Sequence, residues 1–196
     1  MAKRDLNAWT RWLHIYLSMF SFAALLFFSV TGITLNHPAW INIQPKVERF
    51  SGRMEPSWLA SGDSMSVARL EIVEHLRNSH KIKARLTDFR AEDTECSLSF
   101  NGPGYAADVF IDRSTGSYDL TITSAGYVAV LNDIHKGRDT GSGWAIIIEI
   151  SAILMITVSL TGFLMIFFLS KKKVNGLLIA SLGALAFIVL CYIFVW

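Results

Sequence analysis

The sequence predicts an α-helical membrane protein with three transmembrane helices and a small α+β extracytoplasmic domain. Of its 196 residues, 52% are hydrophobic, and the mean hydropathy is +0.40. The apolar residues concentrate in positions 12–45, 140–170 and 174–196, where Glu149 is the only Asp, Glu, Lys or Arg. Each of these segments is long enough to cross a bilayer as a helix. The charged stretch of about a hundred residues between the first two segments is enough for one small domain.

The charge distribution predicts both the domain boundaries and the orientation. We expect transmembrane helices over residues 8–37, 144–169 and 174–196, with the outer domain over residues 38–139. Residues 38–143 carry 12 basic and 14 acidic side chains, a net charge of −2. All other basic residues lie at the chain start or between the second and third helices: Lys3, Arg4, Arg11, Lys171, Lys172 and Lys173. The positive-inside rule then predicts a cytoplasmic N-terminus and periplasmic residues 38–143 in a bacterial inner membrane.

A cleaved signal peptide is the alternative interpretation of the first helix. Its basic start fits that interpretation, but its apolar run is too long and no small-residue cleavage site follows. We therefore expect a retained membrane anchor and a multi-pass protein.

The sequence predicts that the outer domain consists of one helix packed on a small antiparallel sheet. Apolar residues alternate over 84–90, 96–100, 105–112 and 117–123, as they do in half-buried strands. A helix is expected over residues 66–79, a shorter one over 126–134, and a linker with some extended structure over 39–63. His75 and His80, on or just after the first of these helices, are expected to be exposed polar residues.

Three histidines stand at the predicted ends of the membrane helices. His14 and His37 are 23 residues apart in one helix, which corresponds to about 34 Å of helical rise and to about the thickness of the hydrocarbon core. His135 precedes the second apolar helix and is expected at the height of His37. Ionisable residues in membrane segments are costly and often functional. Two imidazoles on adjacent antiparallel helices, His37 and His135, could face each other across a haem iron.

Several polar residues near this pair suit a haem site. Arg138 and Lys136 are placed to pair with haem propionates, and Asn36 or a backbone carbonyl could fix the tautomer of a ligating imidazole. Glu149 could relay a proton, accept a hydrogen bond from His135, or act as a capping carboxylate at the N-terminus of its helix. A Zn²⁺ or Cu²⁺ site made from the same histidines is a weaker alternative, because no Cys or acidic cluster accompanies them.

His14 has no second histidine on its side of the membrane. A haem there would need a five-coordinate iron, a methionine such as Met165, or the His14 of a second protomer in a homodimer. The two cysteines, Cys96 and Cys191, have neither a disulfide nor a metal-type spacing.

A short segment of the first helix is repeated in the second. Ser29-Val-Thr-Gly-Ile33 resembles Ser159-Leu-Thr-Gly-Phe163. Glycine at such a position allows close approach between two helices, or between a helix and a flat ring. Ordinary small-residue packing explains the repeat equally well.

Several short motifs, in this order and spacing, resemble the PepSY-associated transmembrane helix family. They are Arg11-Trp-Leu-His14, Thr31-Gly-Ile-Thr-Leu-Asn-His37, Phe110-Ile-Asp-Arg-Ser-Thr-Gly116, Leu131-Asn-Asp-Ile-His135 and Thr161-Gly162. The resemblance runs from Ala8 to about Phe168 and implies a PepSY-like domain held outside between membrane helices. Some family members are haem b reductases of ferric iron or ferric siderophores. The resemblance thus implies haem b, with His14, His37 and His135 as iron ligands, although larger members have four or more helices and a bigger outer part.

The resemblance and the histidines together favour a membrane ferric, or ferric-siderophore, reductase. It would carry electrons across the lipid bilayer to ferric iron or a ferric chelate on the periplasmic side. Nothing resembles a nicotinamide or flavin fold, so the donor would be external, either a quinol or a cytoplasmic reductant such as reduced flavin. A homodimer is expected and a nucleic-acid partner is not. The alternative is a non-catalytic accessory or regulatory module that binds a transporter or peptidase.

Overall fold

The computed structural model describes residues 2–37, 44–59, 67–169 and 171–196. The chain divides into two compact units. The first combines Met1–Phe27 with Ile146–Trp196, and the second is Phe28–Ala145. The helix α1 (Ala2–Asn36) contributes residues to both units.

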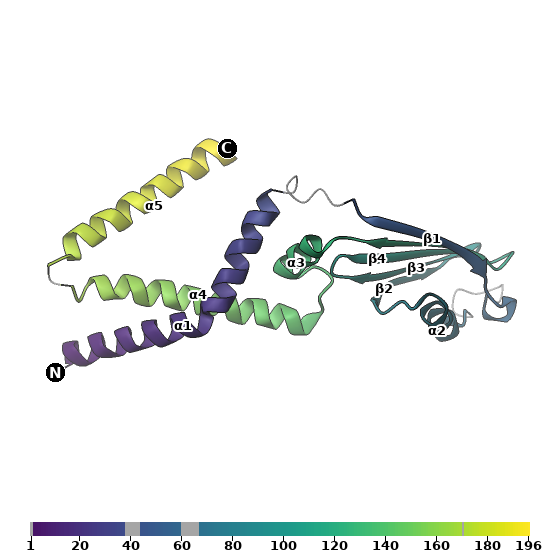
Figure 1. The fold of residues 1–196 in the computed structure, drawn as a ribbon, viewed down its shortest axis with the longest axis horizontal. Helices are drawn as coiled ribbons and strands as arrows, with labels where there is room; N and C mark the ends of the chain where they lie inside the picture. Colours follow the sequence, from purple (N-terminus) through teal and green to yellow (C-terminus); the bar gives the residue numbers. More distant parts are fainter. Residues whose placement is uncertain (1, 38–43, 60–66, 170) are drawn as a thin grey trace. The chain divides into compact units, whose positions relative to one another are not determined.

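Among the described residues, three helices are long and apolar enough to cross a membrane (Figure 1). They are α1, α4 (Ser142–Ile166) and α5 (Lys173–Val195). The α1 helix begins at Ala2 rather than at the expected residue 8, because its polar first turns are good helix formers although they are too charged for hydrocarbon. The α4 helix ends at Ile166, three residues before the predicted end. Pro38, which would stop the first helix because proline disfavours helical backbone in the residue before it, lies outside the described residues.

Small hydroxyl side chains provide the buried polar residues of the first unit. Thr10 and Ser21 of α1 and Ser151 and Thr161 of α4 are each at most 8% exposed. Each hydroxyl donates a hydrogen bond to the carbonyl four residues earlier in its own helix, at 2.7–2.8 Å. Small residues of this kind let membrane helices approach closely. No described residue of α5 is buried within the chain.

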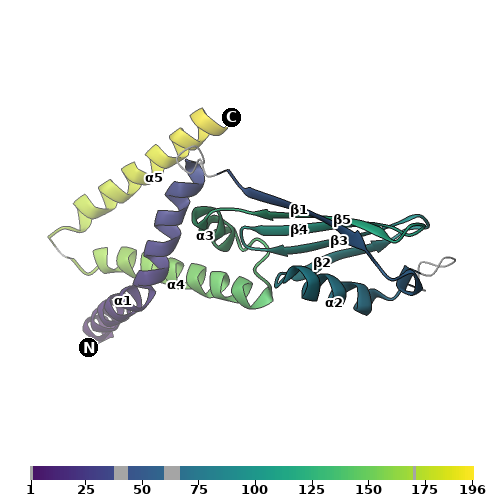
Figure 2. The ribbon, with the colours of Figure 1, turned by 45° about the vertical axis from the view of Figure 1, so that its right-hand side comes forward.

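The second unit is built on a five-stranded antiparallel sheet of order β1-β5-β4-β3-β2. The strands are β1 (Lys46–Arg53), β2 (Arg85–Ala91), β3 (Glu95–Gly102), β4 (Tyr105–Asp112) and β5 (Ser117–Ser124). The helix α2 (Arg69–His80) lies along one face of the sheet (Figures 1 and 2), preceded by the short 3₁₀ helix η2 (Pro56–Leu59). Its buried Ile72 and Leu76 pack with Leu98, Phe100 and Val109 of the sheet in one core.

Two expectations for this unit need correction. The edge strand β1 occupies part of the expected linker over residues 39–63, and it pairs with β5 along its whole length. Most of its side chains are exposed, so it lacks the apolar alternation that marks the other strands. The first helix of the unit begins at Arg69 rather than near residue 66.

The turn between β4 and β5 explains the Asp-x-x-Thr-Gly part of the motif at Phe110–Gly116. The Asp112 carboxylate accepts hydrogen bonds from the Ser114 hydroxyl and from the backbone N–H groups of Ser114 and Thr115. Gly116 has a φ of +69°, which glycine adopts without steric cost. These bonds hold the pKa of Asp112 below its usual value, with the Ser114 hydroxyl as the largest cause. The motif is therefore a turn signature.

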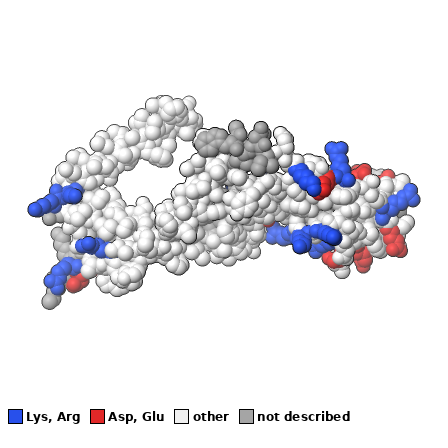
Figure 3. All heavy atoms as spheres, viewed as in Figure 1, with Lys and Arg blue, Asp and Glu red and all other residues white. Residues whose placement is uncertain are grey.

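Charged side chains are distributed unevenly over the molecule. On the face shown in Figure 3, Lys, Arg, Asp and Glu gather on the sheet and near the ends of the apolar helices, whose flanks are uncharged. This distribution is the one expected when the apolar helices face lipid and the sheet faces water.

Candidate functional site: two histidines seated on Thr-Gly steps

His135 lies in the last turn of α3 (Tyr127–Lys136), not in the loop expected to follow that helix. Its Nδ1 is 2.6 Å from the hydroxyl of Thr31 on α1, and its ring meets the Phe28 ring edge-on with centroids 5.2 Å apart. A Cβ added to Gly32 would lie 3.8 Å from Cε1 of the same ring. The imidazole therefore rests on the Thr31-Gly32 step of α1.

Neighbouring contacts fix the position of α3 within the second unit. The hydroxyl of Thr34 donates to Asn132 at 2.7 Å, one turn from the Thr31–His135 contact on both helices. Asp133 accepts a hydrogen bond from the backbone N–H of Gly104 in the β3–β4 turn. The three polar residues of Leu131-Asn-Asp-Ile-His135 thus dock α3 on α1 and on the sheet.

Two further contacts hold the C-terminal end of α3. Gly137 ends the helix with a φ of +70°, and its N–H bonds to carbonyls in the last turn of α3. The indole of Trp144 donates to the carbonyl of Ile134 at 2.7 Å. Because both contacts lie next to His135 in the chain, they hold in place the helix end that carries this histidine.

His14 has the same arrangement in the first unit. Its Nδ1 is 3.1 Å from the hydroxyl of Thr161 and 3.1 Å from the carbonyl of Val158, both on α4. A Cβ added to Gly162 would lie 3.1 Å from Cε1 of His14, a close approach that needs a glycine. His14 of α1 therefore rests on the Thr161-Gly162 step of α4.

These two seats explain the repeated Ser-x-Thr-Gly segment. The copy in α1 receives the histidine of α3, and the copy in α4 receives the histidine of α1. The repeat is visible in the sequence, and its glycine is compatible with a flat ring. The sequence does not indicate that the two threonines are the partners of His135 and His14.

The hydrogen bonds also indicate which ring nitrogen is available. A carbonyl oxygen only accepts, so the bond to Val158 places a proton on Nδ1 of His14. The hydroxyl of Thr161 already donates to carbonyls of its own helix and can accept from the same Nδ1. The hydroxyl of Thr31 lies 3.5 Å from the carbonyl of Phe28 and 2.6 Å from Nδ1 of His135, so it can donate to either of them. When Nδ1 carries the proton, Nε2 of each ring has a lone pair, and the described residues give it no hydrogen-bond partner.

Thr31 is the α1 residue that contacts Nδ1 of His135. His37 follows the last residue of α1 and lies six residues after Thr31, which is about 9 Å of helical rise. Asn36 is exposed, and the residue that bonds His135 is Thr31.

Arg138 and Glu149 are both exposed in the structure. The Arg138 side chain is mostly exposed, and its Nε lies 3.7 Å from the carboxylate of its neighbour Asp139. Glu149 is exposed and lies seven residues after the start of α4 at Ser142. The capping interpretation of Glu149 is therefore wrong, because the helix dipole acts mainly within the first turn.

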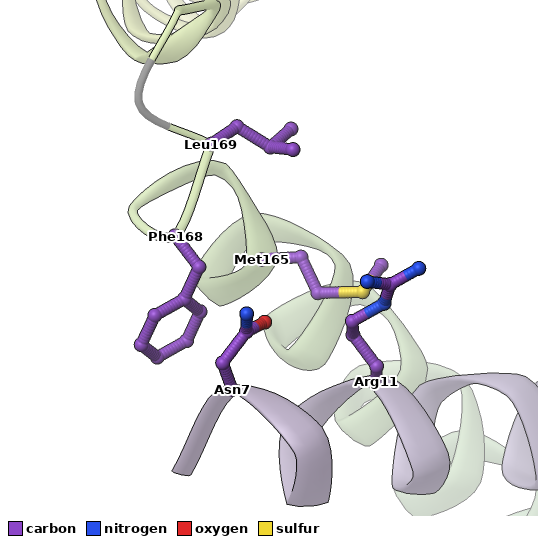
Figure 4. Close-up of a pocket in the computed structure, with 5 residues that line it drawn as sticks. All are labelled: Asn7, Arg11, Met165, Phe168 and Leu169. Atoms are coloured by element: carbon purple, nitrogen blue, oxygen red, sulfur yellow. The ribbon is translucent and has the colours of Figure 1, made fainter. Parts of the chain in front are cut away.

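A pocket of about 330 Å³ lies beside the His14 seat within the first unit (Figure 4). Asn7 and Arg11 of α1 face Met165 of α4, and Phe168 and Leu169 complete the lining. Arg11 is one turn before His14, and Met165 is one turn after Gly162. The methionine considered as a second ligand for His14 thus lies in the neighbouring turn, next to a cationic side chain.

Comparison with known families identifies the chain. The profile of the PepSY_TM-like family matches residues 8–196, nearly the full length. The chain belongs to the PepSY_TM-like family. This finding confirms the family suggested by the motifs and, with the three apolar helices, supports a membrane protein. Comparison with curated proteins and with solved structures gave no match.

The remaining histidines of this PepSY_TM-like protein belong to its sheet unit. His75 meets Trp58 edge-on, and Nε2 of His80 is 2.9 Å from the hydroxyl of Tyr118. Both side chains are partly buried, so the expectation of exposed polar residues is wrong. Burial, and then the charge of His75, lower the pKa of His80. No group of three or more His, Cys, Asp and Glu side chains suited to a metal ion occurs among the described residues.

Proposed function

We propose that this PepSY_TM-like protein is a haem b protein of the bacterial inner membrane. It would carry electrons from an external quinol or cytoplasmic donor to ferric iron or a ferric chelate on the periplasmic side. The single observation that carries this proposal is the pair of histidine seats, in which Nδ1 of each ring is held by a threonine hydroxyl.

The chemistry of this donor set fits haem iron. Histidines that bind metal usually have the other ring nitrogen tied to a carbonyl, carboxylate or similar oxygen, which fixes the tautomer and the ring orientation. His135 and His14 both meet that requirement. An imidazole nitrogen with a lone pair, held among apolar helices, is the kind of donor that would hold haem iron. When bound, haem supplies an iron centre that accepts and releases one electron.

The chain's own residues have defined tasks under this proposal. Thr31 and Thr161 orient the imidazoles, and Gly162 leaves room for the His14 ring beside the helix backbone. His37, at the outer end of α1, is proposed to hold haem together with His135. Arg138 is proposed to hold a propionate, and Arg11 is suitably placed to do so near His14.

The proposed orientation follows from charge. The basic residues before α1 and between α4 and α5 favour the cytoplasm, so the sheet unit would lie in the periplasm. His14 would then receive electrons near the inner face, and His135 and His37 would lie toward the acceptor. Completion of the His14 site by Met165 or by a second protomer in a homodimer remains part of this proposal.

Proteoliposomes give a direct test of electron carriage. Vesicles containing the protein and a trapped, membrane-impermeant reductant are mixed with an external ferric chelate and a ferrous-specific dye. We expect dye colour to develop with wild-type protein and to fall to the protein-free rate with the His14→Ala/His135→Ala variant. Equal rates for the two proteins would refute the proposal. Co-purification of a transporter or peptidase with colourless protein would instead support the accessory-module alternative.

A further inference from the structure

A hollow of about 420 Å³ opens at one end of the sheet in the second unit. It lies between the segment that leads from α2 to β2 and the turn that joins β3 to β4. Its lining consists of Lys81, Lys83, Ala84, Gly102, Pro103 and Tyr105. Pockets of this size commonly hold small molecules.

The hollow is positively charged, although the outer domain as a whole carries a net charge of −2. Lys81 and Lys83 are exposed, and among the described residues neither is in an ion pair, whereas Lys46 pairs with Glu48 at 2.8 Å. Arg85, two residues further on, is also outside the ion pairs of the described chain. No acidic residue lines the hollow. These cations are therefore available to a ligand.

Lys81 has an unusual backbone conformation for its residue type. It caps the C-terminus of α2 with a φ of +56° and a ψ of +35°, in the left-handed region. Glycine is the common residue at such a cap, because a Cβ is unfavourable there by about 1 kcal/mol or more. A lysine at this position therefore keeps its side chain at the rim of the hollow at a cost in backbone strain.

Tyr105 adds a neutral hydrogen-bond donor and an aromatic wall. Burial, and then the charge of Glu48, raise the pKa of its phenol, so the hydroxyl stays protonated at neutral pH. Its cross-strand partner Gly102 has no side chain, and a Cβ there would have only Ala84 nearby, at 3.8 Å. The hollow thus combines ammonium groups, a phenol and the space left by the missing side chain of Gly102.

A smaller pocket of about 170 Å³, which shares Gly102 and Tyr105 with the hollow, is lined by different charges. It contains Asp133, Arg138 and Asp139, and the Asp139 carboxylate faces Arg138 while Asp133 accepts from Gly104. Because acidic groups outnumber the cation there, an anionic ligand favours the lysine side.

We propose that the hollow formed by Lys81, Lys83 and Tyr105 binds an anionic, oxygen-rich ferric chelate, such as a polycarboxylate complex. This inference rests on the proposed function and narrows its acceptor. Ammonium groups repel a hydrated ferric ion, whereas they form strong charge-assisted hydrogen bonds with anionic oxygens. The Tyr105 hydroxyl donates to the same ligand. The chelate is held at the sheet turn to which Asp133 connects α3, and His135 follows two residues later.

A redox-inert analogue tests this inference without electron transfer. Gallium(III) citrate binding to the full-length protein in nanodiscs is measured by equilibrium dialysis with metal analysis at low ionic strength. We expect saturable binding that weakens about tenfold in Lys81→Ala/Lys83→Ala and falls as salt rises. Lys46→Ala removes an equal charge from an existing ion pair and is expected to leave binding unchanged.

The Lys81→Gly variant separates binding from folding. Glycine relieves the left-handed strain, so this variant is expected to melt at or above the wild-type temperature while binding gallium citrate several-fold more weakly. Two comparison ligands, free citrate followed by a carbon-14 label and the neutral gallium(III) tris(acetohydroxamate) followed by its metal, are expected to bind more weakly than gallium citrate. Wild-type affinity in the double variant, or equal binding of either comparison ligand, would overturn the assignment.

The outcome is independent of the haem question. Gallium(III) accepts no electron under these conditions, and the dialysis reads metal retention alone. Lysine-dependent binding by a colourless protein would support the hollow and refute the haem proposal. A haem protein that does not bind gallium citrate would support the haem proposal and refute the role of the hollow.

Discussion

The Thr31–His135 contact provides the sharpest prediction of the histidine-seat account. Replacing Thr31 by Val keeps the shape of the side chain but removes the hydroxyl that lies 2.6 Å from Nδ1 of His135. Thr31 is 3% exposed, so water has little access to replace the lost oxygen. In the Nδ1–H tautomer the imidazole then loses its acceptor, and only packing on Phe28 still orients it.

The expected loss of haem affinity depends on how many oxygen atoms lie within hydrogen-bond distance of Nδ1 of the histidine. Loss of the only oxygen bonded to a buried N–H costs about 1–3 kcal/mol, and loss of such support for a metal ligand lowers metal affinity by about 10–100-fold. The corresponding change at the other seat, Thr161→Val, leaves the Val158 carbonyl 3.1 Å from Nδ1 of His14. We therefore expect only about a two- to threefold loss there, from about 0.5 kcal/mol.

Haem titration of the purified apoprotein measures both effects. Thr31→Val is introduced into a His14→Ala background, so that the seat of His14 does not contribute, and Thr161→Val into a His135→Ala background. Thr10→Val serves as the control in each, because Thr10 is also buried but bonds only within its own helix. In the haem-free protein, ¹⁵N spectra of the histidine rings are expected to lose the defined Nδ1–H tautomer of His135 in Thr31→Val. Equal losses at the two seats, or none at either, would refute the reasoning.

Three further predictions address packing and pH. Gly162→Ala places a Cβ 3.1 Å from the His14 ring and is expected to lower the melting temperature and weaken haem binding, whereas Gly183→Ala, with open space around it, changes neither. The unfolded state binds more protons than the folded state below about pH 6.5, because the folded pKa of His80 is lowered. Wild-type melting temperature should therefore fall more between pH 7.5 and 5.5 than that of His80→Gln, and equal falls would contradict this. Asp112→Ala is expected to lower the melting temperature at pH 7, with the difference shrinking below about pH 4 as the carboxylate protonates; a difference independent of pH would count against the turn account.

Local signals made much of the fold predictable. Long apolar runs marked α1, α4 and α5, and alternation marked four of the five strands. The edge strand β1 escaped detection because its exposed side chains carry no alternation and its existence depends on pairing with β5, about seventy residues away. Hydropathy also misplaced the start of α1, since it reports the apolar part of the helix and not its polar first turns.

The candidate site was predictable only in part. The sequence pointed to His14 and His135, yet their partners Thr161 and Thr31 lie 147 and 104 residues away in the chain. No periodicity connects residues at such separations. The repeated Thr-Gly pair could therefore be found in the sequence, but its contact with a histidine could not be predicted. The structure shows that each Thr-Gly pair contacts one histidine. It also shows that Thr31 contacts Nδ1 of His135, the role for which the sequence suggested Asn36.

The central claim is that the two seated histidines hold haem. The most direct measurement is the absorption spectrum of the purified protein, oxidised and dithionite-reduced, for wild type, His14→Ala, His135→Ala and the double variant. The account predicts a Soret band with reduced α and β bands in the wild type, a loss of intensity in each single variant, and no band in the double variant. A wild-type protein expressed with ample haem that shows no Soret band, or a band that survives in the double variant, would contradict it.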